Sequence, residues 1–464
     1  MRRPAALFPV LLVAACTVGP NYRPPEPAAL SVPATYYQRP AEAPAAELGR
    51  WWERFDDPLL TRLIDEATAG NLDLAAASAR LVQARESLVQ ARAGQLPTVD
   101  ASAGAGRNFG PGNNHSSFSL GADAAWEADL FGRVRRGVEA ARADAEASYY
   151  DREALRVAIA AEVATNYVDA RSAQEQLAIA RDTLAIADDN LQIATWRRQA
   201  GLVSSLDVEQ ARAARAQTAA SIPTIENAFA SATYRIAVLT GRAPGALTGE
   251  LSAVRPIPKG PADVAAGIPA DTLRQRPDVR SAERNLAAAT ARIGVAQAAL
   301  YPDLRLSGNI GTSAFSLGGL FNAVTGGIFS SLSQTLFDGG RLRSQVRAQR
   351  AATEAALATY HRSVLTALED VENALNALRA ARERETQLAI ALEAANNSAI
   401  LARSQYRAGL TDFQQLLDAE RTLLSARNGL AGSHGDEALA LVQLYRALGG
   451  GWDPTAAPLT GSHP

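Results

Sequence analysis

Residues 198–210 read RQAGLVSSLDVEQ, and residues 406–421 read YRAGLTDFQQLLDAER. Each segment has a glycine after a long helical pattern, followed by Ser or Asp before a second helical pattern. Glycine is favoured just past a helix end, and Ser and Asp are favoured where a helix begins. Both segments are therefore predicted to be tight turns between antiparallel helices. Their tips contain Gly201, Leu202, Gly409 and Leu410.

These two turns belong to a longer internal repeat. Gly201 and Gly409 are 208 residues apart (409 − 201), and other landmarks recur at nearly the same separation. They are Leu96-Pro97 with Tyr301-Pro302, Leu130-Phe131 with Leu336-Phe337, and Leu239 with Leu448. A period of roughly 200 residues is far too long for a solenoid and indicates a duplicated half. We expect repeats at 58–240 and 277–448, a proline-containing equatorial segment at 241–276 and a tail at 449–464.

The N-terminus has the features of a bacterial lipoprotein. Arg2 and Arg3 precede a short apolar run, so residues 1–15 are predicted to be a signal peptide that cannot span a bilayer as a stable helix. The run ends VAAC, which resembles a lipobox, and Cys16 is the only cysteine. We therefore expect a covalent lipid on Cys16 and, because residue 17 is not Asp, sorting to the outer membrane. Residues 16–57, rich in Pro and Ala, are predicted to be an extended lipidated tether.

Each repeat contains a segment with the two-residue period of β-strands. Apolar residues alternate with small or polar ones at about 98–127 and again at about 303–337, which is the pattern of transmembrane β-hairpins. Open sheet edges are not viable in lipid, and four strands cannot close a membrane barrel. Either these strands lie outside the membrane, or several subunits complete one barrel. Three subunits would supply twelve strands, which is an allowed number.

The remainder of each repeat is predicted to be helical. Long heptad patterns follow Gly132 and Gly340, and each would form a helix on the order of 100 Å long. Shorter return helices are expected at 205–240 and 411–448. We expect the helices at 71–95 and 277–299 to stack end to end with them. The fold class is therefore mostly α, with four β-strands per chain.

The sequence shows no signature of an enzyme or of a metal site. The four histidines, at positions 115, 361, 434 and 463, lack metal-ligand spacing, and no phosphate-binding or dinucleotide-binding motif follows a strand. The formal charge of −2 gives no basic surplus for nucleic acid. The distinctive polar residues lie at the repeated turns. They are Asp207, Gln210, Gln414, Asp418 and Arg421.

Two interpretations of these turn residues stay open. Asp207 is as well explained by helix capping as by a special role. Asp418 and Arg421 are three residues apart, so they can pair on one helix face. In a trimer, three copies of each would form a ring at a narrow tip, which would favour cations.

Several motifs together resemble those of the outer membrane factors of the TolC/OprM type, in particular the NodT-like efflux lipoproteins. They are CTVGPNYRP at 16–24, Trp51-Trp52 with DPL at 57–59, Tyr301-Pro302, LFDGG at 336–340, YRAG at 406–409, LDA at 417–419 and LGGGW at 448–452. The resemblance extends over the whole mature chain. It implies a homotrimer with a twelve-stranded outer-membrane barrel and a long periplasmic α-helical barrel.

The resemblance also implies partners and a gate. The partners are a periplasmic adaptor that docks at the helix tips, an inner-membrane transporter of the resistance-nodulation-division class, and outer-membrane lipid. Asp418 and Arg421 fall where the family has its periplasmic gate, and Gln414 replaces an apolar residue of OprM-like members. The function implied is the exit duct of a tripartite efflux system. The alternatives are a duct for type I protein secretion and a lipid-anchored coiled-coil scaffold without a pore.

Overall fold

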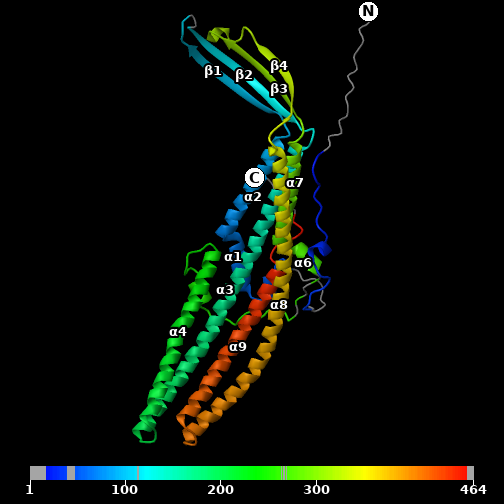
Figure 1. Ribbon diagram of the computed structural model, residues 1–464. Coiled ribbons are helices and arrows are strands. Elements are labelled where there is room, and N and C mark those ends of the chain that lie inside the picture. The colour runs from blue at the N-terminus through cyan, green and yellow to red at the C-terminus, as the bar shows by residue number, and fades with distance from the viewer. Residues whose placement is uncertain are drawn as a thin grey trace, which may run out of the picture.

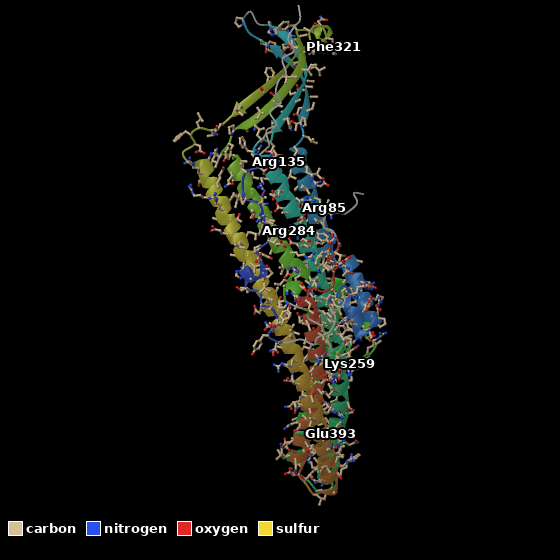
Figure 2. All side chains as sticks on the ribbon, turned by 90° about the vertical axis from the view of Figure 1, so that its right-hand side faces the viewer. Arg85, Arg135, Lys259, Arg284, Phe321 and Glu393 are labelled. Atoms are coloured by element: carbon tan, nitrogen blue, oxygen red, sulfur yellow. The ribbon has the colours of Figure 1, made fainter. Side chains whose placement is uncertain are left out.

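The computed structural model describes residues 17–38, 48–111, 114–262, 264, 267 and 269–456. Cys16 and the expected signal peptide lie outside the described residues. The molecule is elongated, with a β-sheet at one end and the tips of two helical hairpins at the other (Figure 1). In Figure 2, Phe321 lies near the far end of the sheet, Arg135 where the sheet meets the helices, and Glu393 toward the hairpin tips.

The helices follow the duplicated pattern. The long helices are α3 (Arg133–Gln199) and α8 (Arg341–Ala408), and each follows a glycine in the left-handed conformation. The return helices are α4 (Ser205–Leu239) and α9 (Phe413–Ala447). The long helices and their return helices confirm the periodicity predictions to within about two residues, a normal uncertainty for helix ends.

Short helices complete two columns beside the long ones. The helices α1 (Pro58–Gly70) and α2 (Leu72–Ala93) precede the first pair of strands, and α7 (Pro277–Ala298) precedes the second. Both α2 and α4 pack on α3, whereas α7 and α9 pack between α3 and α8. The expected end-to-end stacking beside the long helices is therefore observed (Figure 1).

The four strands form one antiparallel sheet in the order β1-β2-β3-β4. Their bounds are Thr98–Asn108, His115–Ala128, Asp303–Ala314 and Thr325–Ser333. The register aligns apolar residues in rows such as Ala101, Ala122 and Ile310 on one face. The intervening rows, such as Asp100, Asp123 and Asn309, are polar. The strands β1 and β4 each have one neighbour, so each has an unpaired edge in the described chain.

The expected end of the last strand, near residue 337, is wrong. The strand β4 ends at Ser333, which pairs with Asp303. The ladder stops there because the preceding residue of the partner strand is Pro302, which has no N–H to donate. Asp338 then accepts the N–H groups of Gly340 and Leu342, which turns the chain into α8.

The equator of the molecule holds the largest apolar core. Trp51 and Trp52 are fully buried there, and Trp51 stacks on Tyr445 with 5.2 Å between ring centroids. The segment between the repeats contains the short helices α5 (Thr248–Leu251) and α6 (Pro269–Gln275). Among the described residues, no helix combines the length and the apolar character needed to cross a membrane.

The described part of the tether, residues 17–38, runs along α7 and α8. The Tyr22 hydroxyl donates to Glu283 of α7 at 3.1 Å. The backbone N–H groups of Tyr37 and Gln38 donate to the carboxylate of Glu372 on α8, at 2.5 and 3.0 Å. The tether therefore packs on one side of the α7–α8 pair, the side with Glu283 and Glu372.

Candidate functional site

The two predicted turns have the same backbone geometry. Gly201 has φ 71° and Gly409 has φ 76°, both in the left-handed region that favours glycine. The N–H of Leu202 donates to Arg197, and the N–H of Leu410 donates to Gln405, which closes the last turn of each long helix. The next helices begin at side-chain caps, Ser204 for α4 and Asp412 for α9. The turn prediction is confirmed in both copies.

Each turn has a leucine at its end. Leu202 is 68 % exposed and Leu410 is 79 % exposed. Trp196 and Leu206, which flank the first turn, are also exposed, at 58 % and 64 %. Exposed apolar side chains therefore gather at the tips.

The acidic residue that we singled out in the second turn pairs along its own helix. The Asp418 carboxylate accepts a hydrogen bond from Gln414 Nε2 at 3.0 Å and lies 3.6 Å from Arg421 Nη1. The side chains of Asp418 and Arg421 are about 60 % exposed, so the pair has little energy of its own. The pairing prediction is confirmed, and all three residues lie on α9.

The two polar residues singled out in the first turn are less exposed than Asp418. Asp207 is half-buried, and Ser204 Oγ donates to its carboxylate at 3.2 Å. Gln210, one turn further along α4, is also half-buried. The residue that caps α4 is Ser204, whose Oγ accepts the N–H of Leu206, and Asp207 binds the hydroxyl of that cap rather than a backbone N–H.

Contacts that join the two hairpins were not predicted from the sequence. Arg197, in the last turn of α3, donates to the backbone carbonyl of Tyr406 on α8 at 2.6 Å. Its guanidinium also lies 4.5 Å from the centroid of the Tyr406 ring, a cation–π distance. Arg427 of α9 pairs with Asp182 of α3 at 2.6 Å. These contacts hold the second hairpin against the first.

A buried carboxylate lies between the hairpins. Glu420 of α9 accepts from Asn190 of α3 at 2.6 Å and from Arg403 of α8 at 3.1 Å. Burial raises the pKa of Glu420, and the hydrogen bonds from Arg403 and Asn190 only partly oppose that effect. Asn190 is 5 % exposed within the heptad seam of α3. An asparagine in an apolar seam is the signal that could have identified this network.

An apolar cluster surrounds these polar contacts. It contains residues of all four tip helices: Ala194, Val208, Ala211, Ala402, Tyr406, Phe413, Leu416 and Leu417. Small alanines allow the helices to approach closely, and the Tyr406 and Phe413 rings pack with centroids 5.4 Å apart. The two tips of one chain therefore form a single packed unit, which would have to separate or move together when the tips open.

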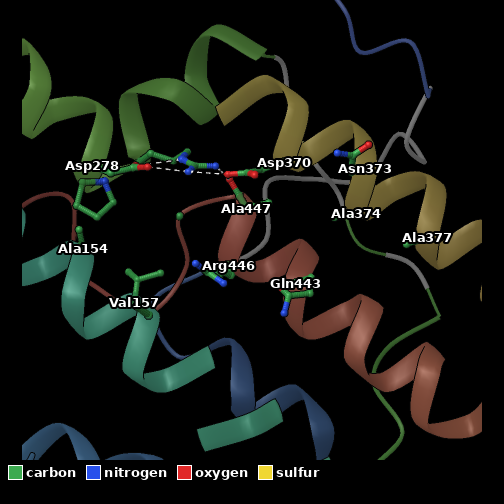
Figure 3. A pocket seen from close by; sticks show the side chains of 14 residues that line it. Ala154, Val157, Asp278, Asp370, Asn373, Ala374, Ala377, Gln443, Arg446 and Ala447 are labelled. Carbon is green, nitrogen blue, oxygen red and sulfur yellow. Dashed lines mark hydrogen bonds and ion pairs between the residues drawn. The ribbon is translucent and has the colours of Figure 1, made fainter. Parts of the chain in front are cut away.

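A charged cavity of about 510 Å³ lies where α9 ends and α7 begins (Figure 3). Arg276 is 8 % exposed, and its guanidinium binds Asp278 at 2.7 Å and Asp370 at 3.0 Å. Burial alone would lower the pKa of Arg276, but the two carboxylates outweigh it and raise that pKa. Val157 of α3 and Gln443 of α9 line the cavity as well.

Within the described ranges, no cluster of His, Cys, Asp and Glu side chains is placed to hold a metal ion. The arrangement consists of long helices, two apolar tips and the polar contacts that hold the tips together.

Comparisons with known proteins indicate the same protein family over nearly the whole chain. The family model described as outer membrane efflux protein matches residues 63–242 and 268–450. Nodulation protein T of Rhizobium leguminosarum bv. trifolii is 33 % identical over 96 % of this chain and 97 % of its own length. The outer membrane protein OprJ of Pseudomonas aeruginosa is 32 % identical over 98 % of this chain and 97 % of its own.

Solved structures have the same fold. The outer-membrane channel OprN superposes with a TM-score of 0.86 at 38 % identity, covering 94 % of this chain and 100 % of its own. The open state of the Neisseria gonorrhoeae MtrE outer membrane channel superposes with a TM-score of 0.85 at 29 % identity, covering 95 % and 99 %. Both similarities include the sheet and the helical hairpins, because nearly all of each chain is aligned.

Proposed function

The chain belongs to the outer membrane efflux protein family, and on that premise we propose that three copies form a duct that passes substrates from the periplasm to the outside. It is an outer membrane efflux protein. The finer features of the duct are its trimeric closure, its lipid anchor, its partners and its gate. Each of these is supported by contacts within the single chain.

The observation that carries the proposal is that contacts made between the two repeats inside the chain have no equivalent at the chain's outer edges. Within the chain, the first repeat joins the second where β2 pairs with β3 and where Phe131 stacks on Tyr301 at 4.7 Å. The equivalent residues at the outer ends are Phe337, 91 % exposed, and Leu96, 66 % exposed. The free edges of β4 and β1 lie beside them in sequence. A ring in which each β4 pairs with the next β1 would satisfy both edges and both side chains.

Three copies give a twelve-stranded barrel, which is an allowed closed number. Its lipid side would be the face with Ala101, Ala122 and Ile310, and its lumen the face with Asp100, Asp123 and Asn309. Closure matters because a free strand edge in lipid leaves backbone groups without hydrogen bonds. The sheet is therefore consistent with one third of a barrel.

The tether supports a lipid at Cys16. A Cβ atom added to Gly132 would lie 2.6 Å from Thr17 Cγ2, so Thr17 is packed where β2 leads into α3. The N–H of Val18 donates to the carbonyl of Phe131 at 3.1 Å. Residue 17 thus lies at the level where the strands end, which is the level that a lipid on Cys16 requires.

At the other end, the apolar tips fit a periplasmic adaptor, which would connect the duct to an inner-membrane transporter of the resistance-nodulation-division class. The duct itself performs no chemistry, and the transporter supplies the energy. The gate would comprise Asp418, Arg421 and Gln414 in the second turn, with Asp207 and Gln210 in the first. The Arg197–Tyr406 contact would hold the two hairpins of each chain in the closed arrangement.

The proposal is tested by mass and conductance. The purified full chain should have the mass of a trimer and conduct across planar bilayers. Phe337→Asp should weaken the trimer, whereas Tyr37→Asp, a change at a 90 % exposed tether position, should not. A monomeric protein without conductance, even after the gate substitutions described below, would favour a scaffold instead.

A further inference from the structure

Three arginines near the start of α8 differ from the residues at the equivalent positions of α3. With the repeat offset of 208, Arg343 corresponds to Arg135, which binds Asp129 at 3.2 Å, and Arg350 corresponds to Arg142, which lies 3.6 Å from Glu146. Arg347 corresponds to Glu139, which binds Arg136 at 2.7 Å. In the second repeat, Arg343, Arg347 and Arg350 are exposed. None of these three guanidinium groups has a hydrogen bond or ion pair with another residue of the described chain.

The lack of partners has a simple cause in the sequence. The nearest preceding acid is Asp338, whose carboxylate accepts the N–H groups of Gly340 and Leu342. These bonds lower the pKa of Asp338. The next acid along α8 is Glu354. The first turns of α8 therefore have a positive charge that the chain itself does not neutralise.

The three arginines share one helix face. Arg343, Arg347 and Arg350 follow a spacing of four and three residues, which places them on one side of α8. At 3.6 residues per turn, Arg343, Arg347 and Arg350 precede Glu372 by about eight, seven and six turns, respectively. Residues separated by whole turns lie on the same side of a helix. Glu372 is the residue that accepts the two N–H groups of the tether. On a straight helix with 3.6 residues per turn, the three arginines fall on the same side of α8 as Glu372, whereas Arg341, about eight and a half turns before Glu372, falls on another side.

This arginine face (Arg343, Arg347 and Arg350) begins at the level where the sheet ends. The helix α8 starts shortly after β4 ends at Ser333, and Arg135, at the equivalent level of α3, lies where the sheet meets the helices (Figure 2). Aromatic residues cluster at the same level: Trp126 donates to the Gln95 carbonyl at 3.0 Å, and Phe131 stacks on Tyr301. Trp and Tyr are enriched at membrane–water interfaces.

We propose that the arginine face binds the phosphate groups of anionic phospholipids in the membrane leaflet that faces the periplasm. This inference rests on the proposed outer-membrane function. Guanidinium groups bind phosphate oxygens in a bidentate manner, and basic clusters next to a membrane segment attract anionic lipid. The face extends ~10 Å along the helix, which is within reach of a headgroup layer and its screened field. Three copies in a trimer would hold a collar of lipid around the base of the barrel.

The test measures lipid binding to the full-length trimer in a neutral detergent. Phosphatidylglycerol is titrated, and the bound lipids are counted by native mass spectrometry. We expect phosphatidylglycerol to bind more tightly than phosphatidylcholine. The triple variant R343Q/R347Q/R350Q should bind phosphatidylglycerol roughly 100-fold more weakly, since each interfacial arginine is worth about 1 kcal/mol.

Three controls distinguish a lipid site on this helix face from a general effect of charge and from a site for free anions. R341Q removes a charge from the same turns but another face and should leave binding nearly unchanged. R343K/R347K/R350K keeps the charge and should retain most of the binding. Millimolar inorganic phosphate should not displace the lipid; complete displacement would show a site for free anions and overturn the membrane assignment.

Unchanged phosphatidylglycerol binding in the triple glutamine variant would also overturn the proposal. Conductance of that variant in phosphatidylcholine bilayers should equal that of the wild type. If the triple glutamine variant loses lipid binding but conducts normally, the lipid site is supported. If neither the variant nor the wild type conducts, the result counts against the duct.

Discussion

At the junction of α4 and α2, Asn71 donates to the last carbonyl of α4, that of Leu239, at 2.9 Å. At the equivalent junction of α9 and α7, Arg276 donates to the carbonyl of Ala447 at 3.1 Å. Asn71 also caps α2 with its side chain, whereas Arg276 stands at the N-cap position of α7 without a side-chain cap bond. Each of the two binds the end of the lower helix. The first junction is closed by glycine, since a Cβ atom on Gly241 would lie 2.5 Å from the carbonyl oxygen of Gly70. The second contains the charged cavity described above.

The two repeats share the end-to-end stacking of their helices but differ in the side chains that hold the stacked helices together. A neutral amide holds the first column together, and a buried arginine bound to two half-exposed carboxylates holds the second. The same contrast recurs at the tips, where the first turn is largely a capping structure and the second has the Gln414, Asp418 and Arg421 side chains. The second repeat thus has more charged side chains than the first both at the helix junction and at the hairpin tip.

The largest expected effect comes from Arg276→Ala. Removing the guanidinium takes away a charged hydrogen bond to the Ala447 carbonyl, worth about 1.5–3 kcal/mol. It also removes two ion pairs to the half-exposed carboxylates of Asp278 and Asp370, which add roughly 0–1 kcal/mol each. Asn71→Ala should cost only about 1–2 kcal/mol, the usual value for a lost cap and one buried hydrogen bond. The measurement is the free energy of unfolding in urea. Arg274→Ala, at a 73 % exposed side chain, is the control, and equal effects at positions 71 and 276 would contradict the comparison.

The next effect is on the gate. Arg197→Ala removes a charged hydrogen bond to Tyr406, a contact worth about 1.5–3 kcal/mol. If that contact exists only in the closed arrangement, resting conductance should rise roughly 10- to 100-fold, because 1.4 kcal/mol is a factor of ten. Arg212→Ala removes an exposed pair within α4 and should leave conductance unchanged. No increase for Arg197→Ala would show that this contact persists when the duct opens.

A smaller effect is expected from the paired residues of the second turn. Within one chain, the Asp418–Arg421 pair should stabilise α9 by only ~0.2–0.5 kcal/mol. Asp418→Ala and Arg421→Ala should therefore leave the unfolding free energy nearly unchanged and still raise resting conductance, because the gate we propose requires these side chains to meet their copies around the trimer axis. Asp207→Ala should raise conductance less. Unchanged conductance in the first two variants would remove them from the gate.

The sequence predicted those parts of the molecule that local patterns control. The heptad seams predicted α3 and α8, and glycines 201 and 409 predicted the turns, because a left-handed residue after a helix has few alternatives. The end of β4 was misplaced because the alternation continues past Ser333, although Pro302 on the partner strand stops the ladder. The Arg197–Tyr406 and Asn190–Glu420 contacts join residues about two hundred positions apart. No local pattern specifies which long-range pair will form.

The smallest expected effect is a pH dependence at Glu420, which tests whether the hairpins of one chain are held by a charged or a neutral group. Burial raises the pKa of Glu420 above its value in the unfolded chain, so the folded state favours the protonated form. The favourable contribution is therefore complete below the unfolded pKa and is lost as pH rises through the folded pKa. Glu420→Gln stays neutral at every pH and keeps an acceptor for Asn190. The unfolding free energy of this variant, measured relative to the wild type, should therefore increase as pH rises from about 4 to 7. Glu209→Gln, at an exposed site on α4, should show no such trend, and a flat difference for Glu420→Gln would mean that Arg403 fully compensates the buried charge.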